Sequence, residues 1–102
     1  MEKENKIIDE YVILKLGNVY VEKVSARNIS FTNSESKAEM FSIGEKWELA
    51  DFAYKLSKVV EYGFNPEIIQ ITVTQQKESK KVNLCIQGID RFCLKEVNKD
   101  GK

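Results

Sequence analysis

Few side chains in this chain of 102 residues could do chemistry, because the sequence contains no histidine. Histidine is the usual general base, a common zinc ligand and the partner that activates many serine and cysteine nucleophiles. Cys85 and Cys93 supply two thiols with no further metal ligand beside them. Two cysteines are too few for a disulfide scaffold, so we expect reduced thiols in a hydrophobic core.

Carboxylates and glycines give no better sign of catalysis. Glu45, Glu48 and Asp51 follow one another at steps of three near the start of an expected helix, where acidic side chains stabilise the helix dipole. The five glycines stand singly, so the glycine-rich motifs that bind phosphates are missing from the sequence. We therefore expect a protein that is not an enzyme and that uses no cofactor or metal ion.

One stretch, residues 42–63, has the length and periodicity of an amphipathic helix, which we expect over residues 45–62. At roughly 100° per residue, six apolar side chains share one face of it. They are Leu49, Phe52, Ala53, Leu56, Val59 and Val60. Ser42 with Glu45 predicts a capping box at the start, and Gly63 predicts the end. The apolar stripe predicts a helix that covers a sheet.

Two large aromatic residues break the pattern of this helix. Trp47 and Tyr54 fall opposite the apolar stripe, among Asp51, Lys58 and Glu61. Exposed tryptophan and tyrosine are typical of protein interfaces, because they bury a large area at a low cost in side-chain entropy. These five residues are our candidate partner-binding face. The alternative is that both aromatic side chains pack inward, Trp47 against the segment before the helix and Tyr54 against the C-terminal segment.

Alternating β-branched residues predict strands on both sides of the helix. We expect them at residues 11–16, 19–24, 29–32, 68–74, 82–86 and about 89–97. Gly17 and Asn18 tolerate positive φ, which predicts a two-residue hairpin turn between the first two strands. Residues 34–41 predict a short helical turn and the polar residues 75–81 a solvated turn. Residues 89–97 also fit a helix, but their composition favours a strand.

Together these patterns predict one α+β domain over residues 1–102. Its antiparallel sheet has five to six strands, with the main helix packed on one face and a short helical turn beside it. Residues 1–8 and 98–102 are expected to be frayed termini. No run of 18 apolar residues occurs, and the charged start is unlike a secretory signal, so we expect no membrane association and a cytoplasmic location.

The order of these features resembles a group of known proteins. The features are a Tyr-Val-Ile hairpin turned by Gly-Asn, a short strand ending in Phe31-Thr32-Asn33, a capped turn with Lys37-Ala38 and Phe41, a helix stopped by Gly63 and an Ile-Val strand. Over about residues 10–75 this layout resembles small uncharacterised phage and prophage proteins of low-GC Gram-positive bacteria. The resemblance implies a protein that binds and inhibits a host enzyme or an anti-phage defence protein in the bacterial host cell.

The leading expectation is therefore a non-enzymatic protein-binding module that occludes part of a partner's surface. A nucleic-acid-binding accessory protein is the alternative, since aromatic and basic residues fall on or near the strands and could contact bases and phosphates. These residues are Tyr11, Tyr20, Phe31, Phe92, Lys15, Lys23, Arg27, Lys81, Arg91 and Lys95. Equal numbers of basic and acidic residues, 16 each, weigh against it. A structural homo-oligomer, paired through strand edges or through the Trp47 face, is a further alternative.

Overall fold

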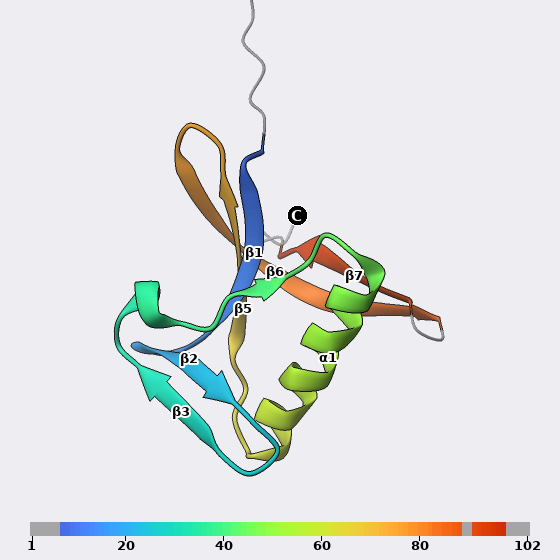
Figure 1. Cartoon of the computed structure of the whole chain (residues 1–102). Coiled ribbons are helices and arrows are strands. Elements are labelled where there is room, and N and C mark those ends of the chain that lie inside the picture. Colours follow the sequence, from blue (N-terminus) through green and yellow to red (C-terminus); the bar gives the residue numbers. More distant parts are fainter. Residues whose placement is uncertain (1–6, 89–90, 98–102) are drawn as a thin grey trace, which may run out of the picture.

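The computed structural model describes residues 7–88 and 91–97, and it confirms an α+β fold built on one antiparallel sheet (Figure 1). The elements are β1 (Asp9–Leu16), β2 (Val19–Val24), β3 (Ile29–Thr32), the 3₁₀ turn η1 (Glu35–Lys37), β4 (Phe41–Ser42), α1 (Lys46–Glu61), β5 (Glu67–Val73), β6 (Lys77–Gly88) and β7 (Arg91–Glu96). The strands follow the order β3-β2-β1-β5-β6-β7, and the short β4 pairs with β1 off this path. The six ordered strands match the expectation, and β4 adds a seventh.

The first hairpin forms where the sequence predicts it. Gly17 has a φ of 60°, and Leu16 lies opposite Val19 across the two-residue turn. Positive φ at the first turn residue matches the right-handed twist of the two strands, which explains why a glycine stands there.

Both faces of the sheet carry apolar residues. On the face toward α1, Phe52 and Val59 of the helix pack with strand residues such as Val12 and Leu14. On the opposite face, Ile13 and Ile71 pack with Ala38, which follows η1. Alternation along β1 produces this division, since neighbouring residues of a strand point to opposite faces. The helix and the turn at residues 35–38 therefore cover the sheet from opposite sides.

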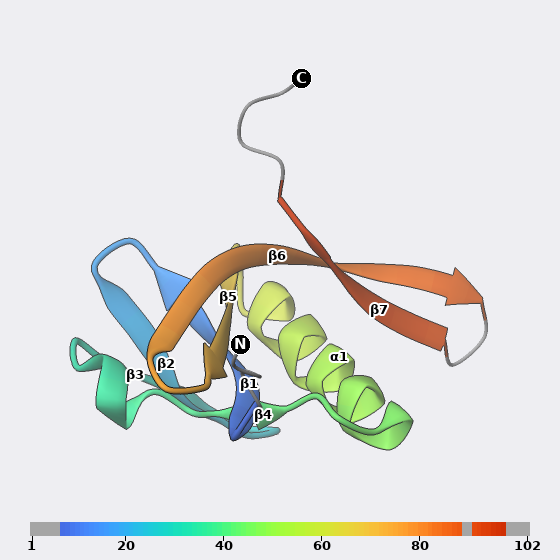
Figure 2. The ribbon, with the colours of Figure 1, turned by 90° about the horizontal axis from the view of Figure 1, so that it is seen from above.

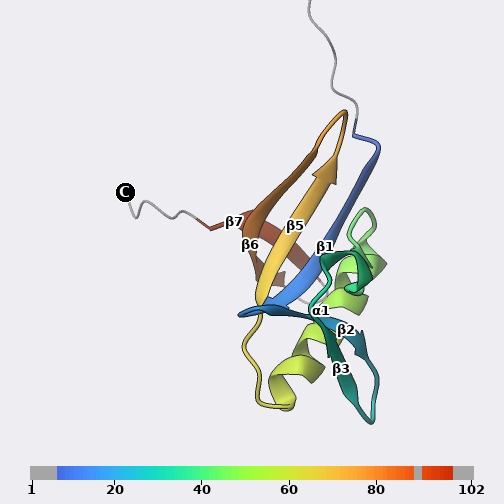
Figure 3. The same cartoon turned by 90° about the vertical axis from the view of Figure 1, so that its left-hand side faces the viewer.

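The sheet curves past α1, and Figure 2 shows β6 and β7 together on one side of the helix, with the start of β7 nearer to it. Figure 3 shows the upright part of the sheet, formed by β1, β5 and β6, with the β2–β3 hairpin beside the helix. Residues 77–82 of β6 pair with β5, whereas the rest of β6 pairs with β7. We call the two-stranded part, residues 83–88 with 91–95, the distal ribbon.

The N-cap residue of the helix lies three positions after the predicted one. Glu45, and not Ser42, is the N-cap residue, and the Glu48 carboxylate accepts hydrogen bonds from the backbone N–H groups of Gly44 at 2.9 Å and Glu45 at 3.0 Å. Ser42 cannot cap the helix because it lies in β4, opposite Tyr11. The predicted end is confirmed, since Gly63 has a φ of 99°.

The prediction that all of residues 75–81 form a turn is wrong. Only residues 74–76 form the bend, and β6 already begins at Lys77 because its pairing with β5 continues to the end of that strand. Lys77 lies 3.6 Å from Glu35, and Lys81 lies 3.1 Å from Glu67, measured between side-chain nitrogen and oxygen atoms. The preference for a strand near residues 89–97 is confirmed by β7.

Both predicted frayed termini fall largely on residues 1–6 and 98–102, outside the described residues. The prediction is wrong for Ile8, whose backbone N–H donates a hydrogen bond of 2.8 Å to the carbonyl of Val73. The pairing of β1 with β5 thus extends one residue beyond the start of β1.

Candidate functional site

The five residues of the predicted partner-binding face lie on the outer side of α1. Trp47 is 67% exposed and Tyr54 is 53% exposed, although both are large aromatic side chains. Asp51 and Glu61 are also exposed, and Lys58 is half-buried. Neither aromatic residue is enclosed by the fold.

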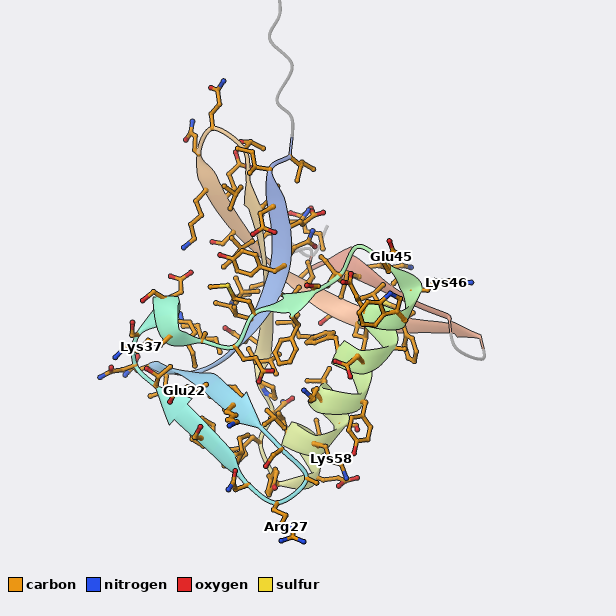
Figure 4. The ribbon with its side chains drawn as sticks, in the orientation of Figure 1. Glu22, Arg27, Lys37, Glu45, Lys46 and Lys58 are labelled. Atoms are coloured by element: carbon orange, nitrogen blue, oxygen red, sulfur yellow. The ribbon has the colours of Figure 1, made fainter. Side chains whose placement is uncertain are left out.

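Three of the five residues contact one another near the C-terminal end of the helix, close to the Lys58 that Figure 4 labels. The Lys58 ammonium lies 3.5 Å from a Glu61 carboxylate oxygen and 5.4 Å from the centre of the Tyr54 ring. The Glu61 carboxylate, followed by the Tyr54 hydroxyl, raises the pKa of Lys58 above its ordinary value. Trp47 and Asp51 stand apart from this cluster, toward the start of α1.

Trp47 lies beside the segment before the helix without being covered by it. A shallow hollow of about 190 Å³ separates the indole from that segment. Its lining residues are Glu39, Met40, Phe41, Ser42, Trp47, Glu48 and Asp51. Phe41 of this segment is buried, whereas its neighbour Met40 is 52% exposed and does not belong to the core.

An apolar groove of about 740 Å³ opens between α1 and the distal ribbon. Its lining residues are Ala50, Ala53, Tyr54, Leu56, Ser57, Val60, Glu61, Leu84 and Phe92. We call it the α1–β7 groove. It includes Tyr54 and Glu61 of the predicted face, so the exposed tyrosine borders a concave apolar surface. This groove was not among the features predicted from the sequence.

Val60 was wrongly assigned to the buried stripe. It is 54% exposed and lines the groove, while its neighbour Val59 is completely buried. The reason is that the helix presents two apolar flanks, one to the sheet and one to the distal ribbon. On the second flank the side chains of Ala50, Ala53 and Ser57 are too small to fill the space before the ribbon, and the groove remains.

A signal for the groove was present in the sequence. Ala50, Ala53 and Ser57 occur at i, i+3 and i+7, which places three small side chains along one flank of a helix. The opposite wall could not be foreseen, because it depends on where β6 leaves β5 and pairs with β7 alone.

Cys85 and Cys93 are half-buried and belong to neither core cluster. The prediction that these thiols lie in the hydrophobic core is therefore wrong. Each lies next to a residue that lines the groove, Leu84 or Phe92. Because side chains alternate along a strand, the two cysteines project from the other face of the distal ribbon. The ribbon is too thin there for a core.

Within residues 7–88 and 91–97, no group of three or more histidine, cysteine or acidic side chains is arranged to hold a metal ion. In the same part of the chain, no helix is long and apolar enough to cross a membrane. The lining residues make the α1–β7 groove an apolar concave surface bordered by Tyr54 and Glu61. Comparison with protein-family models, with curated proteins and with solved structures finds no match for this chain.

Proposed function

We propose that this protein is a non-enzymatic binding module that holds an apolar segment of another protein in the α1–β7 groove. The observation that carries the proposal is an open, apolar groove of about 740 Å³ on a small domain. Apolar concavities of this size on a protein surface are typical binding sites. Tyr54 at its border is the kind of residue that dominates binding energy at interfaces.

The shape of the groove favours an amphipathic helix as the bound segment. Its lining on α1 runs from Ala50 to Glu61, which at 1.5 Å per residue is roughly 16 Å, or about three helical turns. The small side chains of Ala53 and Ser57 allow another backbone to approach α1 closely. A partner helix would place apolar side chains at i, i+3, i+4 and i+7 between α1 and Phe92.

The class of partner follows from the resemblance to phage and prophage proteins. Such a protein would act as an inhibitor or modulator of a host or anti-phage defence protein in the bacterial cytoplasm. Occupation of the groove by a functional helix of that protein would occlude the helix from its normal contacts. Inhibition by occlusion requires no catalytic group.

Binding of nucleic acid receives less support from the positions of the aromatic residues. Tyr11 and Tyr20 pack against the core cluster of Ile13. Phe31 packs against the main core and meets the ring of Phe64 edge to face at 5.2 Å. Bases stack best on neighbouring aromatic rings that share one accessible face. These rings are divided between the two faces of the sheet.

The test compares two serine-to-arginine variants of the intact chain. Ser57→Arg places a long charged side chain at the groove, and Ser30→Arg places the same side chain at an exposed position of β3. Each variant is immobilised and used to capture proteins from a lysate of a low-GC Gram-positive host. The captured protein is then purified, and its affinity for the wild type and for both variants is measured.

The proposal predicts that Ser57→Arg lowers the affinity by about tenfold or more and that Ser30→Arg leaves it unchanged. Equal capture by both variants would show that the groove is not the binding site. Light scattering of the wild type and Ser57→Arg detects a second copy as the occupant. Binding of labelled oligonucleotides that weakens steeply with salt would support the nucleic-acid alternative instead.

A further inference from the structure

We propose that Cys85 and Cys93 form a reversible disulfide across the distal ribbon. The two residues lie directly opposite each other in the pairing of β6 with β7. Directly opposed residues of an antiparallel pair project from the same face of the sheet, so the two thiols are neighbours. This inference concerns a modification site and does not rest on the proposed function.

The backbone hydrogen bonds of the ribbon define the spacing of this pair. The N–H of Val97 donates a hydrogen bond of 3.0 Å to the carbonyl of Lys81, which marks those two residues as a hydrogen-bonded pair. Hydrogen-bonded and non-hydrogen-bonded pairs alternate along an antiparallel ladder, so Cys85 and Cys93 form a hydrogen-bonded pair too. Its Cα atoms are expected about 5.5 Å apart, within the range that disulfides span.

The thiols are also accessible to a small reagent. Both are half-buried, and neither is packed into a core cluster. They lie on the face of the distal ribbon opposite Leu84 and Phe92, which line the α1–β7 groove. A disulfide that small thiols can reach is reduced more easily than one enclosed in a core, so a bond formed between these half-buried residues would be reversible.

The chemistry is an exchange with a low-molecular-weight disulfide such as oxidised glutathione. One cysteine thiolate attacks a sulfur of the reagent, breaks its S–S bond and releases one glutathione thiolate. The second cysteine thiolate then attacks the protein sulfur of the mixed disulfide, which forms the Cys85–Cys93 bond and releases the second glutathione. Two electrons pass from the cysteine pair to the reagent, and the two thiol protons end on the two glutathiones.

The bond would strengthen the least supported part of the sheet. The distal ribbon has two strands, and an isolated two-stranded hairpin is marginally stable in water. A crosslink between its strands restricts their separation. Because the same ribbon carries Leu84 and Phe92, oxidation would fix the outer wall of the groove.

The experiment treats the folded, full-length chain with oxidised glutathione at low protein concentration. Trypsin cuts after Lys81, Arg91 and Lys95, so the disulfide joins peptide 82–91 to peptide 92–95 in a digest without reductant. We expect the digest to contain this linked peptide and the intact monomer to be two hydrogen masses lighter. Addition of dithiothreitol should remove the linked peptide. Amide hydrogen exchange in the distal ribbon should slow by about tenfold or more on oxidation.

A control variant tests whether the disulfide requires two cysteines directly opposite each other or only two cysteines on the same face of the ribbon. The double variant Cys93→Ser, Lys95→Cys moves the second thiol two residues along β7, to the position opposite Asn83. Diagonal partners lie about 7–8 Å apart, beyond the range that a disulfide spans without backbone movement. The variant lacks the trypsin site at residue 95, so its linked peptide joins 82–91 to 92–99. Both chains should form their linked peptide in urea, but under native conditions the wild type should form its own at least tenfold faster. Equal native rates, or separate glutathione adducts on both cysteines of the wild type, would overturn the proposal.

Discussion

The two flanks of α1 differ in how completely they are covered, although both are apolar. On the flank toward the sheet, Phe52 and Val59 are completely buried, and the Phe52 ring lies 5.2 Å from that of Phe41. On the flank toward the distal ribbon, Val60 and Tyr54 are more than half exposed. The difference follows from what faces each flank: a sheet of several strands on one side and a two-stranded ribbon on the other.

An apolar residue on a helix does not by itself identify the core. Val59 and Val60 are adjacent and chemically identical, yet one is inaccessible and the other lines a groove. The first is part of the core, whereas the second is accessible from outside the fold. Substitutions on the two flanks should therefore separate stability from binding.

The largest effect is expected for Phe52→Ala. Removal of a completely buried ring that packs against Phe41 should lower the free energy of unfolding by about 3–5 kcal/mol. Tyr54→Ala, on the exposed side of the same helix, should change it by less than about 0.5 kcal/mol. Urea denaturation followed by tryptophan fluorescence measures both. Similar losses for the two variants would contradict the division of α1 into a buried flank and an exposed flank.

The sharpest comparison uses the two neighbouring valines. Val59→Ala removes buried carbon and leaves a cavity, which should cost about 2 kcal/mol of stability. Val60→Ala should cost about 0.5 kcal/mol or less, because its side chain remains in contact with water. Thermal unfolding of the two variants under identical conditions provides the measurement. A destabilisation by Val60→Ala as large as that by Val59→Ala would mean that the groove is closed in solution.

An intermediate effect is expected at the start of α1, which both flanks share. Glu48→Ala removes the acceptor of two backbone N–H groups, from Gly44 and Glu45, and should cost about 1 kcal/mol. Glu48→Gln keeps an acceptor oxygen and should recover part of this loss. Circular dichroism during denaturation reports both changes. Equal stability of Glu48→Ala and the wild type would show that this cap is not formed.

The smallest effect concerns the charge cluster at the end of the exposed flank. Because the Glu61 carboxylate is the main cause of the raised pKa of Lys58, Glu61→Gln should lower that pKa toward its ordinary value of 10.5. The folding transition near neutral pH should not move measurably, since the ion pair is solvent-exposed. An NMR titration of the lysine side chain gives the pKa. An unchanged pKa in the variant would show that the two side chains do not interact in solution.

Much of the fold could be predicted from local sequence because its signals are strong. The Gly17-Asn18 turn and the period of residues 45–62 each select one structure, and both elements form as predicted. Ser42 was misassigned as a cap because its pairing with Tyr11 is a contact between segments distant in sequence. Local patterns do not contain such contacts.

The candidate site was predictable only in part for the same reason. The periodicity placed Trp47 and Tyr54 on the outer side of the helix, and both are exposed there. The groove needs Leu84 and Phe92 from a ribbon whose position depends on the curl of the sheet. Val60 lines this groove, so the prediction that it belongs to the stripe against the sheet is wrong.

The long β6 strand gives the groove a mechanical property. Its residues 77–82 are hydrogen-bonded to β5, and its later residues form one wall of the groove, so a single continuous strand joins the rigid sheet to that wall. Two-stranded segments twist more strongly than wider sheets. The position of that wall therefore depends on the direction that β6 takes where it leaves β5. Small changes of twist there, near Val82, would be amplified into larger displacements of Phe92 toward or away from α1.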